Sequence, residues 1–143
     1  MAKLQQDPAL WANAVEEGLR IRGTAPGLFR ITTRDVDIGG ATIPEDSIVW
    51  LLYASSGLDD TKFSEPRKFD VTRENAREHL SFGHGRHSCL GNLLARLEAK
   101  LALEALYRKI PSLKALPDQR FEYLPTMTVL TLKQLQVAWD IPA

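Results

Sequence analysis

The chain has 143 residues, 44% of them hydrophobic and 25% charged, which is an ordinary composition for one globular domain. Its 18 basic and 18 acidic residues balance, so charge indicates neither a nucleic-acid partner nor an anionic membrane surface. The single cysteine excludes an internal disulfide bond, and no apolar run approaches the roughly 20 residues that span a bilayer. Because the N-terminal residues lack the apolar core of a signal peptide, we expect a cytoplasmic protein.

The first predicted element is a helix over residues 8–20. Asp7 can cap this helix and Pro8 suits its first turn. Apolar residues recur at helical spacing along it, and Gly23 follows its end.

Strand-like runs come next, at residues 28–32, 35–38 and 41–43. The Gly-Gly pair at 39–40 predicts a hairpin turn between the last two. Residues 47–53 form an almost continuous apolar run, which predicts a buried strand.

The second half of the chain begins with a stretch, residues 55–80, that has no periodicity and is predicted to be irregular. Ordered loops of this length tend to be functional. Residues 91–110 predict the longest helix, which Pro111 ends. Residues 121–140 contain short β-type runs, which predict a terminal hairpin. The apolar stripe of the long helix consists of Leu90, Leu94, Leu97, Leu101 and Ala105.

The segment FGHGRHSCLG, residues 82–91, holds the only cysteine and two of the three histidines. Its glycines allow positive φ and the close approach of a flat or bulky group. Cys89 falls at the N-terminus of the predicted long helix, where unpaired N–H groups stabilise the negative charge of a thiolate. A thiolate is either a metal ligand or a nucleophile, and this setting suits both.

On the residues alone, several interpretations of this segment stay open. A lone cysteine is usually a small buried hydrophobe. A zinc site is an alternative, although the spacing is not that of a finger or ribbon. A phosphate loop would need a lysine and a hydroxyl residue after the glycines, and a cysteine nucleophile would need a better placed base than His87. The zinc ligands would be His79, His84, His87 and Cys89.

The segment resembles the haem-binding loop of the cytochromes P450. The family signature is Phe-Gly-x-Gly-x-His/Arg-x-Cys-x-Gly. Upstream, Glu17 and Arg20 are similar to the Glu-x-x-Arg pair of the same family. The likeness to bacterial, soluble members covers essentially the whole chain, but only the C-terminal third of a family member. The fixed places of the signature are filled by Phe82, Gly83, Gly85, His87, Cys89 and Gly91.

The resemblance implies an α+β fold, the C-terminal portion of the mostly helical P450 fold. Residues 1–143 would form a single partial domain. Its parts would be a helix, a small and mainly antiparallel sheet, an irregular segment, the cysteine loop, a long helix and a terminal β-hairpin.

The resemblance also implies a role for each matching residue. Cys89 would be the axial thiolate on the iron of haem b. Arg30 and His87 would each bind a haem propionate, and Glu17 and Arg20 would form a buried ion pair that fixes the irregular segment. The remaining cofactor contacts would be Phe82 as a shield of the thiolate, Gly83, Leu90 and Gly91 in the loop, and Ala95 over the ring.

The implied activity is that of a monooxygenase, which inserts one oxygen atom of O₂ into a small organic substrate. Electrons would come from NAD(P)H through a ferredoxin or flavodoxin-type donor. Arg73, Arg77 and Arg86 either meet such an acidic donor or form an ordinary solvated face. Two edges of the chain would face substrate: Thr24, Ala25 and Leu28 form one, and Met127, Thr128 and Val129 form the other.

The sequence departs from the family pattern at two points. Where the family has a third arginine that completes the Glu–Arg pair, this chain has Lys68, with Arg67 beside it as a substitute. The acid–threonine pair of the distal haem face lies outside the resemblance, so no catalytic residue is expected in this chain. A truncated or split P450, which binds haem weakly or not at all and is not catalytic alone, is therefore an alternative. Both predicted helices would then expose apolar stripes.

Overall fold

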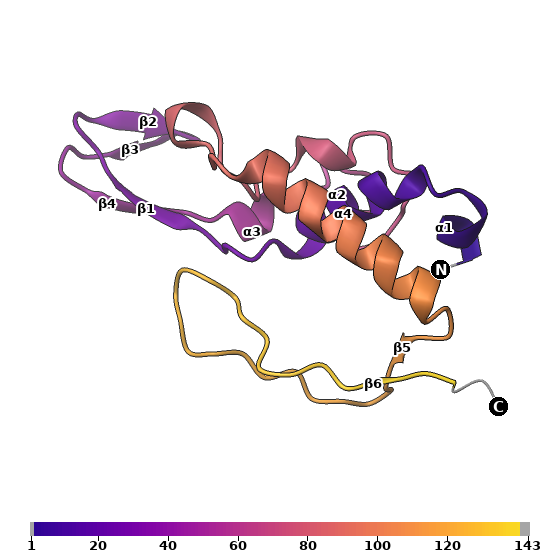
Figure 1. Ribbon diagram of the computed structural model, residues 1–143. Coiled ribbons are helices and arrows are strands. Elements are labelled where there is room, and N and C mark those ends of the chain that lie inside the picture. Colours follow the sequence, from indigo (N-terminus) through magenta and orange to yellow (C-terminus); the bar gives the residue numbers. More distant parts are fainter. Residues whose placement is uncertain (1, 141–143) are drawn as a thin grey trace.

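The computed structural model describes residues 2–140. Its centre is a pair of packed helices, α2 (Leu10–Arg22) and α4 (Asn92–Lys109), with the short α1 (Ala2–Gln6) beside them (Figure 1). The two longer helices are confirmed, each to within two residues of its predicted ends. The sequence analysis did not anticipate α1.

The start of α2 lies two residues later than predicted. The carboxylate of Asp7 accepts the N–H of Ala9 at 3.0 Å, but Ala9 is itself the N-cap residue and no side chain caps α2, so the prediction that Asp7 caps the helix is wrong. Pro8 precedes the helix and is not in its first turn. At the other end, Gly23 takes an extended conformation and directs the chain into the strands.

The hydrophobic core lies where α1, α2 and α4 meet. Leu4, Trp11 and Ala14 are buried there, and the Tyr107 ring of α4 lies 5.6 Å from that of Trp11. The prediction that the first helix exposes an apolar stripe is therefore wrong. Segments of this chain cover that stripe, because α1 and α4 pack on it from two sides.

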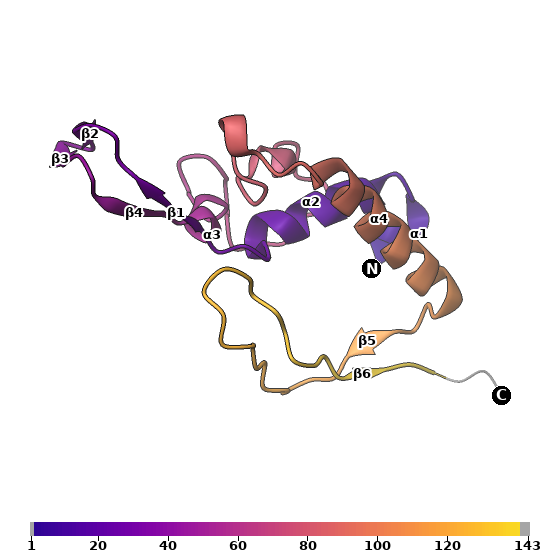
Figure 2. The ribbon, with the colours of Figure 1, turned by 60° about the vertical axis from the view of Figure 1, so that its left-hand side comes forward.

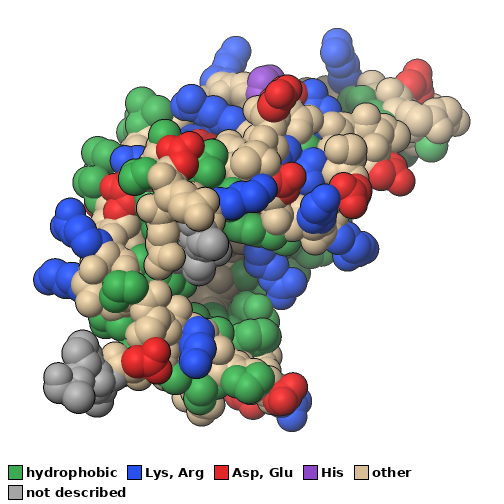
Figure 3. All heavy atoms as spheres, turned by 90° about the vertical axis from the view of Figure 1, so that its right-hand side faces the viewer, with side chains coloured by type: hydrophobic (Ala, Val, Ile, Leu, Met, Phe, Trp, Pro, Cys, Tyr) green, Lys and Arg blue, Asp and Glu red, His purple; other side chains and the backbone are tan. Residues whose placement is uncertain are grey.

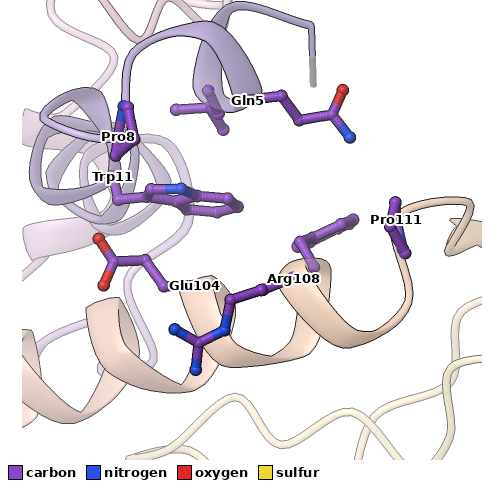
Figure 4. Close-up of a pocket in the computed structure, with 8 residues that line it drawn as sticks. Gln5, Pro8, Trp11, Glu104, Arg108 and Pro111 are labelled. Atoms are coloured by element: carbon purple, nitrogen blue, oxygen red, sulfur yellow. The ribbon is translucent and has the colours of Figure 1, made fainter.

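A hollow of about 440 Å³ separates α1 from the C-terminal end of α4. Figure 4 shows Trp11 reaching across it, with Glu104 and Arg108 on the opposite wall. These α4 residues lie about 18 Å or more along the helix from Asn92 at 1.5 Å per residue. The hollow is thus remote from the cysteine loop.

The strands form three separate two-stranded antiparallel sheets instead of one. β1 (Leu28–Ile31) pairs with β4 (Ile48–Leu51), and β2 (Val36–Ile38) pairs with β3 (Ala41–Ile43). The predicted Gly-Gly turn joins β2 and β3, and its glycines have φ of +59° and +82°. The predicted antiparallel pairing is confirmed.

The prediction of a buried strand over residues 47–53 is wrong. Strand β4 pairs only with β1, so both faces of this ribbon are open, and Ile48 is 76% exposed. Trp50 is also exposed and stacks on Phe29 across the pair, with ring centres 5.8 Å apart. The run ends early because Tyr53 begins the short helix α3 (Tyr53–Ser56).

The predicted irregular segment is confirmed, and it is ordered by side chains. Beyond α3 it contains turns and the 3₁₀ turn η1 (Ala76–Glu78). The Asn13 amide of α2 donates to the carbonyls of Val71 and Arg73 at 2.7 and 2.9 Å. Phe63 is buried under the Arg20 guanidinium, 5.1 Å from ring centre to Cζ.

The C-terminal segment runs as a separate arm beneath the helices (Figure 2). The predicted hairpin is present, but it is slight: β5 (Lys114–Ala115) pairs with β6 (Val137–Ala138), and Tyr123 forms an isolated bridge with Leu132. The arm is tied to the end of α2, because Arg22 donates to the Tyr123 hydroxyl at 3.2 Å.

The apolar stripe of α4 is exposed, as the sequence predicts for this helix. Leu94, Leu97 and Leu101 are each more than half exposed. Figure 3 shows hydrophobic side chains on the walls of the hollow between the helices and the C-terminal arm. Within residues 2–140, none of the helices combines the length and the apolar character needed to cross a membrane.

Candidate functional site

The cysteine loop is a closed turn that leads into α4. The N–H of Cys89 donates to the carbonyl of Phe82 at 2.9 Å, which joins the two ends of the loop. Inside it lies the 3₁₀ turn η2 (Gly85–His87), and Gly83 and Gly85 have φ of +70° and +75°. Side chains with a Cβ rarely adopt this conformation, so the two glycines allow the loop to close.

Cys89 is presented to the outside of this loop. Its side chain is exposed, and Leu90 is fully exposed. Gly91 is the N-cap residue of α4, one step before the first turn in which the sequence analysis placed it. The Asn92 amide donates to the carbonyl of Cys89 at 2.7 Å, and Ala95, also exposed, donates its N–H to the Gly91 carbonyl at 2.9 Å.

Arg30 and His87 come together although 57 residues separate them in the sequence. Both line one open cleft of about 390 Å³. Within residues 2–140 neither has a carboxylate within ion-pair distance. The other walls of the cleft are Leu51, Leu52, Tyr53, Leu80, His84 and Arg86. The cleft therefore joins an apolar wall to cationic and imidazole donors, next to the loop that carries Cys89.

The zinc alternative is not supported by the geometry. Among the residues that the structure describes, no three His, Cys, Asp or Glu side chains lie close enough to hold a metal ion. His79 is buried, and both of its ring nitrogens have partners other than the loop cysteine. Its Nε2 contacts the Glu16 carboxylate at 3.1 Å, and its Nδ1 accepts the N–H of Ser81.

Glu17 and Arg20 form an ion pair whose side chains are completely buried. Arg20 is bound by both carboxylate oxygens of Glu17, at 2.6 and 2.8 Å. The remaining donors of Arg20 reach into the irregular segment, to the carbonyls of Gly57, Pro66 and Lys68. A Cβ at Gly57 would collide with the Arg20 carbonyl, so only glycine permits this approach.

Arg73, not Lys68 or Arg67, is the second cation of this cluster. The Arg73 Nε lies 3.0 Å from Glu17 Oε1, and its side chain is only 7% exposed. The carbonyls of Ser64, Glu65 and Lys68 accept its other donors, while the Lys68 amine is exposed and pairs with Glu65. The prediction of Lys68 is wrong, as is that of Arg67, which is exposed. Because its side chain is buried, Arg73 also does not form part of a surface that a redox donor could contact.

A turn at Asp70 explains why Arg73 reaches Glu17. The Asp70 carboxylate accepts the N–H and the hydroxyl of Thr72, and the N–H of Arg73 donates to the Asp70 carbonyl. The chain thereby reverses direction, and the N–H of Asp70 itself donates to Glu17 at 2.9 Å. The sequence signal was the Asp-x-Thr-Arg pattern, an Asx turn followed by a cation.

A second buried carboxylate, Glu16, was missed by the sequence analysis. It accepts from Arg96 of α4 at 2.6 Å and contacts His79 at 3.1 Å. Burial opposes the ionisation of Glu16, but the hydrogen bonds from His79 and Arg96 outweigh it, so the pKa of Glu16 is lowered. For Glu17 burial acts in the same way, and the bonds from Arg20, Asp70 N–H and Arg73 likewise lower its pKa.

The two expected substrate edges meet. The N–H of Leu130 donates to the carbonyl of Thr24 at 2.6 Å, which joins the C-terminal arm to the segment before β1. On the first edge Thr24 and Leu28 are exposed and Ala25 is half-buried. On the second edge Met127, Thr128 and Val129 are all exposed.

Comparison with known proteins decides the family. The model of the family described as cytochrome P450 matches residues 2–135. The chain belongs to this family. The biotin biosynthesis cytochrome P450 of Bacillus subtilis (strain 168) is 40% identical over 140 residues, which are 98% of this chain and 35% of that protein.

Solved P450 structures have the same fold as this chain. Cytochrome P450 CREJ matches with a TM-score of 0.93 at 38% identity, over 98% of this chain and 35% of that one. P450BioI, in complex with an acyl carrier protein ligated to hexadec-9Z-enoic acid, matches with a TM-score of 0.90 at 39% identity, over 97% and 36%. The chain thus spans about a third of the length of the P450 relatives that it matches. Its helices and small antiparallel sheets correspond to one portion of the P450 fold.

Replacement of Arg73 by alanine is expected to destabilise the folded chain by about 2–4 kcal/mol. Glu17 would stay buried with Arg20 and the Asp70 N–H as its only donors, and the carbonyl of Ser64 would lose its donor. Urea unfolding measures this loss. Lys68→Ala is the matched control and should leave the midpoint almost unchanged, because its amine is exposed. Equal effects of the two substitutions would contradict the assignment.

The stability of the chain is expected to fall as the pH drops below about 4.5. Because the folded-state pKa values of Glu16 and Glu17 are lowered from 4.5, their contribution is complete above the unfolded value and is lost as each carboxylate protonates in the folded state. Hydrogen bonds from Thr61 and Thr72 also lower the pKa of Asp59 and Asp70, which extends the loss to lower pH. Urea midpoints from pH 7 to pH 3 measure it. Glu17→Gln should flatten the curve, and an unchanged slope would contradict this origin.

Proposed function

We propose that this chain forms the proximal, thiolate-bearing wall of a haem site in a P450 monooxygenase. One observation carries the proposal. Cys89 is exposed at the end of a loop that its own N–H closes, and His87 of that loop shares a cleft with Arg30. A cysteine in this setting is available as a ligand and is not occupied as a packing residue.

The donor set of the site fits haem b. This cofactor is a flat apolar ring that carries two carboxylates and an iron that takes a protein ligand. The cleft offers Leu51, Leu52 and Tyr53 as an apolar wall, and Arg30 and His87 as groups that can bind carboxylates. Within residues 2–140 neither has a carboxylate partner; Arg30 Nη1 donates to the Phe29 carbonyl at 2.8 Å, and the other donors of Arg30 could bind a propionate.

When bound, haem supplies the oxygen chemistry of the family, and the chain supplies its ligand and surroundings. Cys89 would hold the iron as a thiolate, and the N–H groups of Leu90 and Gly91, which lie next to it in the chain, would donate to its sulfur. The half-buried Phe82 ring restricts water on the proximal side. Gly83 adds no side chain to the loop, and Ala95 presents only a small side chain on the first turns of α4.

The substrate is a small organic molecule that meets the joined edges of Thr24–Leu28 and Met127–Val129. Electrons come from NAD(P)H through an acidic ferredoxin or flavodoxin-type donor. Arg77 and Arg86 remain exposed and available to such a donor. Arg73 is not among these residues, because its side chain is buried against Glu17.

A second candidate function is haem binding without turnover by this chain alone. The exposed leucines of α4 and the open cleft support it. One wall of a haem site would leave the other face of the ring open to water, so a bound haem would lack the dry cavity that directs its oxygen chemistry to a substrate.

The first test is the optical spectrum of the purified chain mixed with haem, reduced and exposed to carbon monoxide. Thiolate ligation predicts the strongly red-shifted Soret band of P450 proteins. Cys89→His should abolish this band while it keeps a ligand, and Ser88→Ala is the neighbouring control that should retain it. Survival of the band in Cys89→His would refute the ligand assignment. An absence of haem binding by the unchanged chain would refute the proposal for this chain alone.

Removal of the propionate donors is expected to weaken haem binding. A hydrogen bond to a charged group contributes about 1.5 kcal/mol or more, so Arg30→Ala and His87→Ala should each raise the Kd for haem roughly tenfold. Titration followed by absorbance measures the Kd. Arg34→Ala removes an exposed arginine that does not line the cleft, and it should have no effect. An effect of Arg34→Ala as large as that of Arg30→Ala would indicate that the cations act only through overall charge.

A further inference from the structure

Glu16 lies at the centre of a cluster that the haem proposal does not use. It neighbours Glu17 on α2, but it faces a different part of the chain. Glu17 binds the irregular segment, whereas Glu16 binds Arg96 of α4 and His79, which precedes the cysteine loop. Arg77 of η1 is a second arginine near it, at 3.8 Å, and its side chain is 69% exposed.

Both close partners of Glu16 contact Phe82, the first residue of the cysteine loop. The Arg96 guanidinium lies over the Phe82 ring, 4.4 Å from its centre. The His79 ring packs 6.1 Å from the same centre, tilted by 41°. Asn92 also accepts from Arg96 through its side-chain oxygen at 2.9 Å, which ties the guanidinium to the first turn of α4.

The position of Phe82 determines where Cys89 lies. The Phe82 carbonyl accepts the Cys89 N–H, and no other bond between backbone atoms joins these two ends of the loop among the residues described. A shift of the Phe82 ring would move its carbonyl and therefore the backbone of Cys89. The carboxylate of Glu16 is the element common to both contacts of the ring. Without that carboxylate, His79 would lose its carboxylate partner beside Phe82, and Arg96 would keep only Asn92 of its own helix as an acceptor.

We propose that Glu16 is a positioning residue for Cys89: through Arg96 and His79 it holds Phe82, and through Phe82 it holds the cysteine loop. Glu16 touches neither the cysteine nor the cleft, so its role is indirect. This inference concerns the chain without cofactor, and only its spectroscopic readout rests on the proposed function.

Amide hydrogen exchange of the full chain tests the proposal. In Glu16→Gln, which keeps the shape and removes the charge, protection of the Cys89 N–H should fall about tenfold, while that of Ala95 in α4 changes little. Arg77→Gln is the matched control. It removes a cation near Glu16 that does not touch Phe82, and it should leave Cys89 unchanged. Glu16→Asp, which keeps the carboxylate, should recover part of the protection.

Two results would overturn the proposal. One is unchanged protection of Cys89 in a folded Glu16→Gln chain. The other is an equal loss at Cys89 and Ala95, which would mean that Glu16 only supports the fold. If Glu16→Gln does not fold, Arg96→Lys serves instead, because it keeps the ion pair and removes the planar group over Phe82. Unchanged Cys89 protection in that variant would likewise overturn the proposal.

The carbon monoxide spectrum gives the second readout. With haem bound, Glu16→Gln should convert part of the thiolate band into a band without thiolate, and Arg77→Gln should not. A full thiolate band in Glu16→Gln would contradict positioning of the ligand. If the unchanged chain shows no thiolate band at all, the haem proposal fails, while the exchange experiment still decides the role of Glu16.

Discussion

The buried carboxylate of Glu17 is the constraint on which the rest of the structure depends. A charged group without access to water must be surrounded by donors. Glu17 meets this requirement with Arg20, Arg73 and the N–H of Asp70. The two arginines have further N–H donors, and these bind backbone carbonyls in the turns of the irregular segment. Those turns are not paired with a strand or a helix. The irregular segment is therefore ordered by charge and hydrogen bonds more than by apolar burial, and the ion cluster specifies one arrangement of it.

Glu16 is a second buried carboxylate that binds donors in the same way, on the other side of α2. Because consecutive residues of a helix point about 100° apart, two adjacent glutamates can bind two different segments. One holds the irregular segment, and the other holds α4 and the start of the cysteine loop. The haem site proposed here thus depends for its position on α2, which contributes no side chain to the cleft or the loop.

The sequence predicted best those parts of the structure that depend on residues close together in the chain. The cysteine loop was recognised because its glycines, cysteine and histidine stand at fixed short spacings, and α4 because its apolar stripe is regular over many turns. Arg73 was missed, since its role depends on a chain reversal at Asp70 that brings it to a helix far away in the sequence. The apolar run at 47–53 was misjudged for a related reason: whether a strand is buried depends on what covers it, and β4 has one neighbour and two open faces.

The separation in sequence between α2 and its partners has a consequence for synthesis. Glu16 and Arg96 are 80 residues apart, and Glu17 and Arg73 are 56 apart. At about 5–20 residues per second, a ribosome needs roughly 4–16 seconds to add 80 residues. During that interval Glu16 lacks Arg96, and until Arg73 is made Glu17 has only Arg20 of its own helix as a charged partner, so α2 must remain hydrated and open. The core of this chain is therefore assembled late, when α4 closes the longest of these loops.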